Sequence, residues 1–374
     1  MSGIYLHIPF CKQDCHYCNF YFTLSREREN DFTDALCREI ELSAASWPYP
    51  KIETLYFGGG TPSLLSNESF QKIISQLKTS FDLTHLRECT LEVNPDDMHD
   101  ERAAMWKEAG VNRLSIGVQS FSDCHLKYMN RAHDGQQAIA SINTALRVGI
   151  VSLNVDLIYG VPGMTDKEWS DNIHQAAALG VNHLSCYALT VEEGTRLAQK
   201  IQKGRSAPVS EEDAARHFEI LTDLAPGLGF VPYEISNLAR PGHEAVHNQN
   251  YWLYKPYLGL GPSAHSFDGI TRGQNAANLK KYIDHLKMDT RPVEQETLSN
   301  NEQYNEYVMI RLRTRFGCSI QEIEFRFGKK YRDHFETVLQ ESESDFFQVQ
   351  ENIVSLTNRG RLLADRITVD FLMT

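Results

Sequence analysis

Three cysteines near the start of the chain, Cys11, Cys15 and Cys18, follow an apolar run with the spacing C-x3-C-x2-C. Thiolates this close in sequence hold a metal more readily than they form disulfides with one another. A 4Fe-4S cluster bound by three thiolates keeps one iron open for a small chelating ligand, and S-adenosylmethionine offers an amine and a carboxylate that suit that iron. The spacing therefore predicts a cluster-binding loop over residues 11–18.

Two other interpretations of these cysteines are open at this point. One is a zinc site, in which His16 or His7 completes a tetrahedron of three cysteines and one histidine. Zinc sites usually show a second pair of ligands some 12 to 20 residues further on, and this sequence has none at that distance. The other is three unrelated thiols, since free cysteine is an ordinary core residue.

Composition limits the classes of protein to consider. The chain has 374 residues, 41% of them apolar, which is enough for one large domain and a smaller one. A net charge of -12 argues against a protein that mainly binds nucleic acid. No run approaches the roughly 20 apolar residues of a membrane span, and the N-terminus does not read as a secretion signal. The other five cysteines are scattered singly, so we expect a reducing, cytoplasmic location.

Short apolar runs alternate with helix-patterned segments over the first half of the chain. This alternation is typical of βαβ units, and six of them predict an α/β fold, an open partial (β/α)6 barrel. The helix expected near residues 70–81, for example, repeats apolar residues every three or four positions. The six expected strands are 4–8, 54–57, 90–93, 114–118, 153–158 and 184–189.

Polar and glycine-rich motifs follow or end these expected strands. The cysteines follow the first strand and Gly58-Gly59-Gly60-Thr61-Pro62 the second. In barrel enzymes the carboxyl ends of the strands form the active face, so these groups should converge on one mouth. The glycines would let backbone amides approach a ligand carboxylate. Taken singly, each of the remaining polar residues is more often a structural group than a functional one. These residues are Glu92, Gln119, Arg131 and Asp156.

The rest of the chain divides by composition. We expect residues 1–225 to form the barrel, 226–290 a connecting segment, and 291–374 a C-terminal helical domain. Residues 194–210 read as a linker before a helix over 211–224, and Pro226 and Gly227 exclude regular helix beyond it. In the connecting segment, 247–252 and 259–266 read as loops or short strands. Helices expected at 301–316, 319–327 and 332–341, a strand pair over 346–357 and a last helix from Asn358 resemble a winged-helix module. Its segment 311–332 is basic, but we expect a solvated face there and no nucleic-acid binding.

Many separate motifs, in order, resemble the HemN/HemW branch of the radical S-adenosylmethionine family. The resemblance implies that Cys11, Cys15 and Cys18 bind the 4Fe-4S cluster. The motifs are Tyr-Leu-His-Ile-Pro-Phe-Cys, the cysteine loop, Gly-Gly-Gly-Thr-Pro, Glu-Val-Asn-Pro, Ile-Gly-Val-Gln-Ser-Phe, Asn-Arg and Asp-Leu-Ile-Tyr-Gly. The residues that it places around S-adenosylmethionine are Tyr5, Tyr17, Gly59, Gly60, Thr61, Glu92, Gln119, Arg131 and Asp156.

Two departures separate this chain from the HemN oxidases, which decarboxylate coproporphyrinogen III. Phe20 stands where those enzymes carry a further cysteine, and only ten residues precede Cys11. The segment His247-Asn248-x-x-Tyr251-Trp252 resembles the signature of the HemW haem chaperones. This resemblance implies that the chain binds haem and passes it to acceptor proteins, with oxidase activity as the alternative. An electron donor would be needed for radical chemistry, and the oligomeric state is open, with a homodimer as one alternative.

One histidine of that segment has two interpretations. His247 is a candidate axial ligand of the haem iron, because neutral imidazole is a common ligand for haem. It could equally be a histidine packed against Tyr251 or Trp252. His265 is a weaker candidate for the axial ligand.

Overall fold

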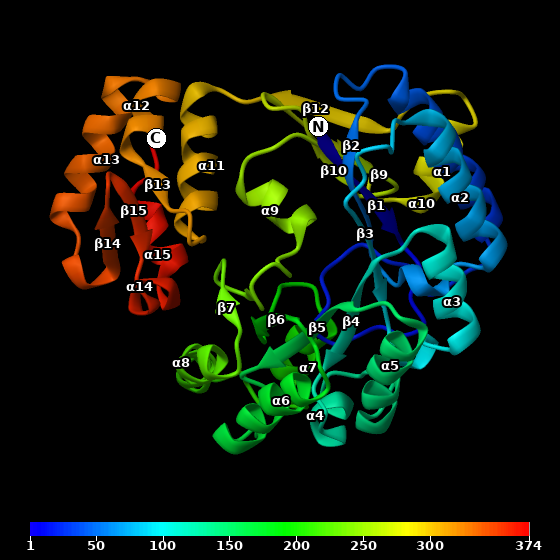
Figure 1. Ribbon diagram of the computed structural model, residues 1–374, viewed down its shortest axis with the longest axis horizontal. Helices are drawn as coiled ribbons and strands as arrows, with labels where there is room; N and C mark the ends of the chain where they lie inside the picture. Colours follow the sequence, from blue (N-terminus) through cyan, green and yellow to red (C-terminus); the bar gives the residue numbers. More distant parts are fainter. Residues whose placement is uncertain (374) are drawn as a thin grey trace.

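A single twelve-stranded sheet organises most of the molecule in the computed structural model, which describes residues 1–373. The strand order is β12-β11-β10-β9-β1-β2-β3-β4-β5-β6-β8-β7, and a separate three-stranded sheet has the order β13-β15-β14. Figure 1 shows the large sheet flanked by helices, with the C-terminal helices packed at its left.

The six central strands run parallel and form the partial barrel that the sequence predicts. Their apolar residues are buried on both faces of the sheet, which is why the strands read as nearly continuous apolar runs. Each predicted strand lies within or beside an observed one. The strands are β1 (Ser2–Ile8), β2 (Ile52–Gly59), β3 (Glu88–Val93), β4 (Arg113–Gln119), β5 (Ser152–Tyr159) and β6 (His183–Ala188).

Helices between the strands cover the barrel, and their apolar stripes form the outer part of its core. In α2, Phe70, Ile73, Ile74 and Leu77 are all buried, as their spacing predicts. Several of these helices begin at side-chain caps, such as Ser66 and Thr165. The helices are α1 (Glu29–Ala44), α2 (Asn67–Ser80), α3 (Asp100–Ala109), α4 (Asp123–Tyr128), α5 (Gly135–Val148), α6 (Asp166–Ala178), α7 (Arg196–Gln202) and α8 (Glu211–Gly227).

Two predictions about this part of the chain were wrong. The linker expected over 194–210 contains α7, which Thr195 caps by accepting from the amide of Ala198. Helix α8 continues through Pro226 to Gly227, where the sequence predicts that regular helix has already ended. A proline in the last turn removes one helical hydrogen bond only, so the helix ends just beyond it rather than before it.

The segment that follows the barrel adds strands to both edges of the sheet. On one side β8 (Asn237–Ala239) pairs antiparallel with β6, and β7 (Val231–Pro232) pairs with β8. On the other side β9 (Tyr257–Leu260) pairs parallel with β1. Antiparallel strands continue from it. These are β10 (His265–Phe267), β11 (Thr271–Asn275) and β12 (Val293–Thr297), with helix α10 (Leu279–Leu286) between the last two.

Residues 246–252 form a helix, α9 (Val246–Trp252), where the sequence predicts a loop or short strand. The carboxylate of Glu88 accepts hydrogen bonds from the amides of Val246 at 2.8 Å and His247 at 3.0 Å. A carboxylate at this position satisfies amides that have no partner inside the helix. The helix is thus stabilised by a residue 158 positions away in the chain, which no local pattern could show.

The C-terminal residues 298–373, called the C-terminal module below, have a small core of their own. The order of helices and the strand pair agrees with the winged-helix-like arrangement that the sequence predicts. The hairpin turns at Glu351 and Asn352, which both have positive φ, as tight hairpin turns require. Its elements are α11 (Asn300–Leu312), β13 (Cys318–Ser319), α12 (Ile320–Phe327), α13 (Lys329–Glu341), β14 (Phe347–Gln350), β15 (Ile353–Leu356), α14 (Asn358–Leu362) and α15 (Ala364–Asp370).

The basic segment of this module is largely neutralised by acids of the same chain. Its arginines form ion pairs with Glu322, Asp365, Glu244 and Glu324. Arginines that are paired with acids create a weak positive potential and attract a phosphate backbone weakly. This agrees with the expectation that the segment is a solvated face. Among residues 1–373, no helix combines the length and the apolar character that a membrane span needs. The paired arginines are Arg311, Arg313, Arg315, Arg326 and Arg332.

Candidate functional site

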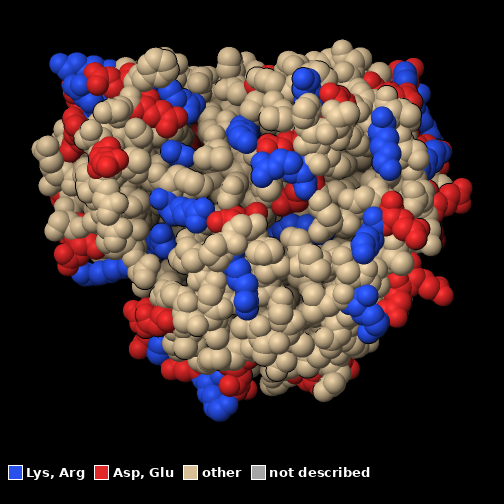
Figure 2. Space-filling model, viewed as in Figure 1, with Lys and Arg blue, Asp and Glu red and all other residues tan. Residues whose placement is uncertain are grey.

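A cavity of about 1210 Å³ opens over the carboxyl ends of the barrel strands and extends toward the C-terminal module. Side chains from β2 to β6, the cysteine loop, α8 and the C-terminal module line it. Figure 2 shows Lys and Arg side chains gathered where the C-terminal module meets the rest of this face of the molecule. Parallel strands that end at one edge explain why residues far apart in the sequence meet here.

The structure places most of the predicted site residues in the lining of this one cavity. Tyr5 and His247 are the exceptions, because neither lines the cavity. The ring of Tyr5 stacks on Tyr56, which does line it. The roles of these residues toward a cofactor stay predictions. Those in the lining are Cys11, Cys15, Tyr17, Cys18, Gly59, Gly60, Thr61, Glu92, Gln119, Arg131 and Asp156.

Backbone hydrogen bonds hold the cysteine loop over the mouth of the barrel. The amide of Cys11 donates to the carbonyl of Thr23 at 3.0 Å, and that of His16 to the carbonyl of Met129 at 3.1 Å. The side-chain amide of Asn130 donates to the carbonyl of Asp14 at 2.7 Å. The loop is therefore tied to the segment after α4, which also carries Arg131.

All three thiols of the loop are free and half-buried, as ligands of an incoming metal cluster must be. Arg131 donates from Nη1 to Sγ of Cys15 at 3.3 Å, and the hydroxyl of Thr61 donates to Sγ of Cys11 at 3.6 Å. Burial raises the pKa of the Cys11 thiol to about 12, although the hydrogen bond from Thr61 opposes this. A bound cation would be needed to hold this sulfur as a thiolate.

The histidines of the zinc interpretation are engaged elsewhere. Nε2 of His7 donates to the carbonyl of Tyr21 at 2.9 Å. His16 is bonded through Nδ1 to the carbonyl of Tyr128 at 2.7 Å and through Nε2 to Lys200 at 2.8 Å. Within the described part of the chain, no three His, Cys, Asp or Glu side chains converge on a single ion. A 4Fe-4S cluster spreads three thiolates over three irons, so the free, cavity-lining thiols fit it better than they fit zinc.

The glycine motif after β2 has a different role from the one predicted. Its amides are already bonded: Gly59 donates to Oε2 of Glu92 at 3.2 Å, Gly60 to the carbonyl of Ile8 at 2.8 Å and Thr61 to that of Phe10 at 2.7 Å. A Cβ on Gly60 would lie 2.8 Å from the Phe10 carbonyl oxygen. The glycines are thus needed so that β2 can approach the start of the cysteine loop, rather than to present free amides to a carboxylate.

Glu92 lies on β3 and lines the cavity, and both of its carboxylate oxygens accept hydrogen bonds. The hydroxyl of Tyr56 donates to its Oε1 at 2.8 Å, and Oε2 accepts from Gly59. Burial, and secondarily the charge of Asp156, raises the pKa of Glu92 to about 7. Asp156 accepts from the side-chain amide of Asn154 at 2.7 Å. Two carboxylates in one cavity make its inner part acidic, which suits a cationic or hydroxyl-rich ligand.

Arg131 links the cysteine loop to β4 and to the residue that follows β3. Besides Cys15, it donates from Nη2 to Oδ1 of Asn94 at 2.7 Å and to the carbonyl of Gly117 at 2.8 Å. Gln119, at the end of β4, has a φ of 65°, unusual for a residue with a side chain. Asn94 was not predicted as a site residue. It directly follows β3, and a polar residue just after a barrel strand was the signal that could have identified it.

Both ring nitrogens of His247 are hydrogen-bonded within the protein, and its role as an axial ligand of haem stays a prediction. The side chain is 1% exposed. Nδ1 is hydrogen-bonded to the hydroxyl of Thr54 at 2.7 Å and Nε2 to that of Tyr251 at 2.8 Å. Burial lowers the pKa of the imidazole to about 3. The ring also packs against those of Tyr56 and Tyr251, in line with the other interpretation.

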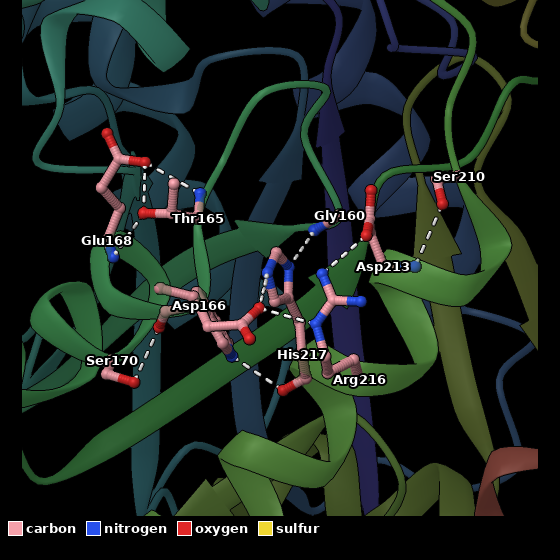
Figure 3. Close-up of polar contacts among 10 residues, drawn as sticks. Gly160, Thr165, Asp166, Glu168, Ser170, Ser210, Asp213, Arg216 and His217 are labelled. Atoms are coloured by element: carbon pink, nitrogen blue, oxygen red, sulfur yellow. Dashed lines mark hydrogen bonds and ion pairs between the residues drawn. The ribbon is translucent and has the colours of Figure 1, made fainter.

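Helix α8 forms one wall of the cavity and is held by polar contacts with α6 and the end of β5, drawn in Figure 3. The amide of Gly160 donates to Nδ1 of His217 at 3.1 Å, and Asp166 lies 3.4 Å from Nε2 of the same ring. Nε1 of Trp169 donates to the His217 carbonyl at 2.8 Å. Arg216 bridges Asp166 and Asp213 on the outer side. The position of α8 in the cavity wall thus depends on the contacts of the buried His217.

Sequence reasoning also missed the inner face of β4 and the arginines of the C-terminal module. Side chains two residues apart on a strand share a face, so stepping back from Gln119 gives Gly117, Ser115 and Arg113, and all of them line the cavity. This alternation was the signal that could have found Arg113. No short-range signal could have found the module's contribution, which includes Arg313, Arg361 and Arg366.

Comparisons with known families match two parts of the chain. The family model of the Radical SAM superfamily matches residues 5–176, which contain the second half of β1, the cysteine loop and β2 to β5. The model of the HemN C-terminal domain matches residues 298–363, within the C-terminal module.

Similar proteins span essentially the whole chain. The heme chaperone HemW of Bacillus subtilis (strain 168) is 36% identical over 100% of this chain and 99% of its own length. The heme chaperone HemW of Mycobacterium tuberculosis is 35% identical over 98% of this chain and 93% of its own. Among solved structures, coproporphyrinogen III oxidase (HemN) from Escherichia coli, described as a radical SAM enzyme, aligns with a TM-score of 0.87 at 25% identity. That alignment covers 100% of this chain and 90% of the oxidase chain.

Proposed function

Because this chain belongs to the HemW family of radical SAM proteins, we propose that it is a haem chaperone. It binds a 4Fe-4S cluster through Cys11, Cys15 and Cys18, holds S-adenosylmethionine beside that cluster, and binds haem for delivery to acceptor proteins. The observation that supports this most is the presence of three free thiols and two carboxylates in one large cavity. Eight free thiols also fit a reducing cytoplasm.

When bound, the cluster and S-adenosylmethionine supply one-electron chemistry at the mouth of the barrel. The protein's own residues bind and orient. Glu92 accepts hydrogen bonds from amine or hydroxyl groups, and Asp156 adds a second acceptor deeper in the cavity. Arg131 keeps a positive charge beside Cys15, to whose sulfur it donates a hydrogen bond. An electron donor is required only if the sulfonium is cleaved.

An oxidase function is the second candidate, and the alignment with the HemN structure over the whole chain favours it. It would decarboxylate propionates of coproporphyrinogen III. Phe20 is two-thirds exposed at the cavity, in the position that carries a further cysteine in the oxidases named above. We favour the chaperone because its relatives match the full length at higher identity than the oxidase structure does.

An anaerobic titration separates the two functions. Protein reconstituted with iron and sulfide is titrated with haem, and is incubated separately with coproporphyrinogen III, S-adenosylmethionine and a reductant. We expect stoichiometric haem uptake, transfer of haem to an apo-acceptor and no decarboxylated product. Product formation without haem transfer would establish the oxidase and refute the chaperone.

A further inference from the structure

Arg113 is a buried guanidinium with no bonded partner. It is 3% exposed, and its Nε and Nη2 atoms have no hydrogen-bond partner within the described part of the chain. It forms no ion pair there, although Asp156 lies near enough for the charge of Arg113 to oppose the raised pKa of that carboxyl. The bonds of Asp156 come from Asn154 and Ser115. Leaving two buried guanidinium nitrogens without an acceptor is strongly unfavourable, so such a group calls for an anionic ligand.

Arg113 lies at the opposite end of β4 from the cysteine loop, although its charge still acts on Asp156, one of the predicted cofactor residues. Arg113 begins β4, whereas Gln119 ends that strand near the cysteine loop. Six residues of strand span roughly 20 Å. Ligand cavities usually measure about 300–1,000 Å³, and this one measures about 1210 Å³. The cavity is therefore larger than a single small cofactor requires.

The outer part of the same cavity carries apolar side chains. Ile158 and Phe218 come from β5 and α8, Ile235 from the segment before β8, and Leu362 and Leu363 from the C-terminal module. A guanidinium and a group of apolar side chains in one cavity fit a ligand with a flat apolar body and a carboxylate at one edge. Arg361 of the module also lines the cavity and has no ion pair in the described residues.

We propose that Arg113 binds a carboxylate of a porphyrin, so that the porphyrin enters the cavity propionate-first between α8 and the C-terminal module. This rests on the proposed haem-binding function and adds the group that recognises the ligand's acidic edge. S-adenosylmethionine also carries a carboxylate that a guanidinium can bind, and the test distinguishes this ligand from the porphyrin.

The test compares haem with its dimethyl ester, in which both carboxylates are blocked. Affinities of the reconstituted protein are measured for haem, the ester and S-adenosylmethionine, with Arg113→Gln, Arg113→Lys and the exposed control Arg205→Gln. We expect the unchanged protein to prefer haem over the ester by about 10- to 100-fold. Arg113→Gln should lose that preference with ester affinity unchanged, Arg113→Lys should regain part of it, and Arg205→Gln should behave as the unchanged protein.

Several results would overturn the proposal. If Arg113→Gln weakens S-adenosylmethionine binding and not haem binding, the guanidinium serves the cofactor. If the unchanged protein binds haem and its ester equally, haem binding stands and the role of Arg113 fails. If the unchanged protein takes up no haem at all, the proposed function fails as well. Thermal unfolding of the ligand-free variant guards against misfolding: Arg113→Gln should unfold no lower than the unchanged protein, because no partner is lost. A large drop would make Arg113 structural.

Discussion

Glu92 shows how one buried side chain links the fold to ligand binding. Its carboxylate stays beside Asp156 because Tyr56 and Gly59 bond it from two sides. Burial places its pKa at about 7, so the residue changes charge within the physiological range. Only the ionised form accepts hydrogen bonds at both oxygens from amine and hydroxyl groups.

Binding of S-adenosylmethionine should therefore strengthen as pH rises. Below its pKa Glu92 is protonated, so affinity should increase up to about tenfold per unit from pH 6 toward 7 and level off above pH 8. Glu92→Gln should weaken binding by about 1–3 kcal/mol at pH 8 and flatten this dependence. Isothermal titration calorimetry between pH 6 and 8 checks both, with the exposed Glu101→Gln as control. An unchanged slope in Glu92→Gln would contradict the assignment.

Residue-scale prediction from the sequence succeeded where the signal was local. The cysteine spacing and the polar residues at strand ends could be identified because parallel strands bring their carboxyl ends together. The amides of Gly59 and Gly60 were misassigned, because their partners, Glu92 and the Ile8 carbonyl, come from other strands. Strand alternation from Gln119 could have found Arg113, but its lack of a hydrogen-bond partner depends on contacts between strands that the sequence does not show.

At the scale of elements, α9 packs between the C-terminal module and the large sheet (Figure 1) and places His247 against β1 and β2. A Cβ on Gly3 of β1 would lie 3.1 Å from the imidazole ring of His247. The helix could not be predicted from the sequence, because its N-terminal partner is Glu88 and its packing partner is Thr54. Both contacts are long-range.

His247→Leu should destabilise the fold without removing a haem ligand. Loss of the bonds to Thr54 and Tyr251 is expected to lower the free energy of unfolding by about 2–4 kcal/mol at pH 7. The folded pKa of about 3 lies below the unfolded value near 6.5, so the neutral ring stabilises the fold fully at pH 7 and progressively less as pH falls from 6.5 toward 3. Denaturant unfolding at pH 7 and pH 5 should show the deficit narrowing at pH 5.

Haem affinity of the folded His247→Leu protein should stay near that of the unchanged protein. A loss of the haem absorption band with stability intact would instead make His247 an axial ligand.

The contacts of α8 in Figure 3 lead to a similar prediction for His217. His217→Leu removes the acceptor for the Gly160 amide and should lower the free energy of unfolding by about 1–3 kcal/mol. His217→Gln, which can still accept that bond, should lose less. Arg216→Gln changes an exposed pair beside it and should leave stability nearly unchanged. Equal losses in the Leu and Gln variants would contradict the role given to the Gly160 bond.

At the scale of the whole molecule, the C-terminal module closes one side of the cavity. A bidentate ion pair holds it: Arg272 of β11 donates to Glu306 of α11 at 2.5 and 2.7 Å. Tyr254 donates to the same carboxylate at 2.9 Å, and Arg315 pairs with Glu244. The module's own core was predictable from its helix and hairpin pattern. Its place beside the barrel was not, because these contacts join segments that no periodicity connects.

Glu306→Gln should loosen the module. Replacing the carboxylate weakens three hydrogen bonds at a site that is less than one-third exposed, which we expect to cost about 2 kcal/mol of docking free energy. Limited proteolysis should then cut faster near residues 298–300, and haem affinity should fall while the iron content stays unchanged. Matched cleavage rates in Glu306→Gln and the unchanged protein would show that the module is held by other contacts.

The most direct test of the central claim is iron and acid-labile sulfide analysis of anaerobically reconstituted protein, beside Cys15→Ser and the exposed-cysteine control Cys124→Ser. We predict about four irons and four sulfides per chain in the unchanged protein and in Cys124→Ser, and a marked loss in Cys15→Ser. Zinc in place of iron, or full iron content in Cys15→Ser, would contradict the account.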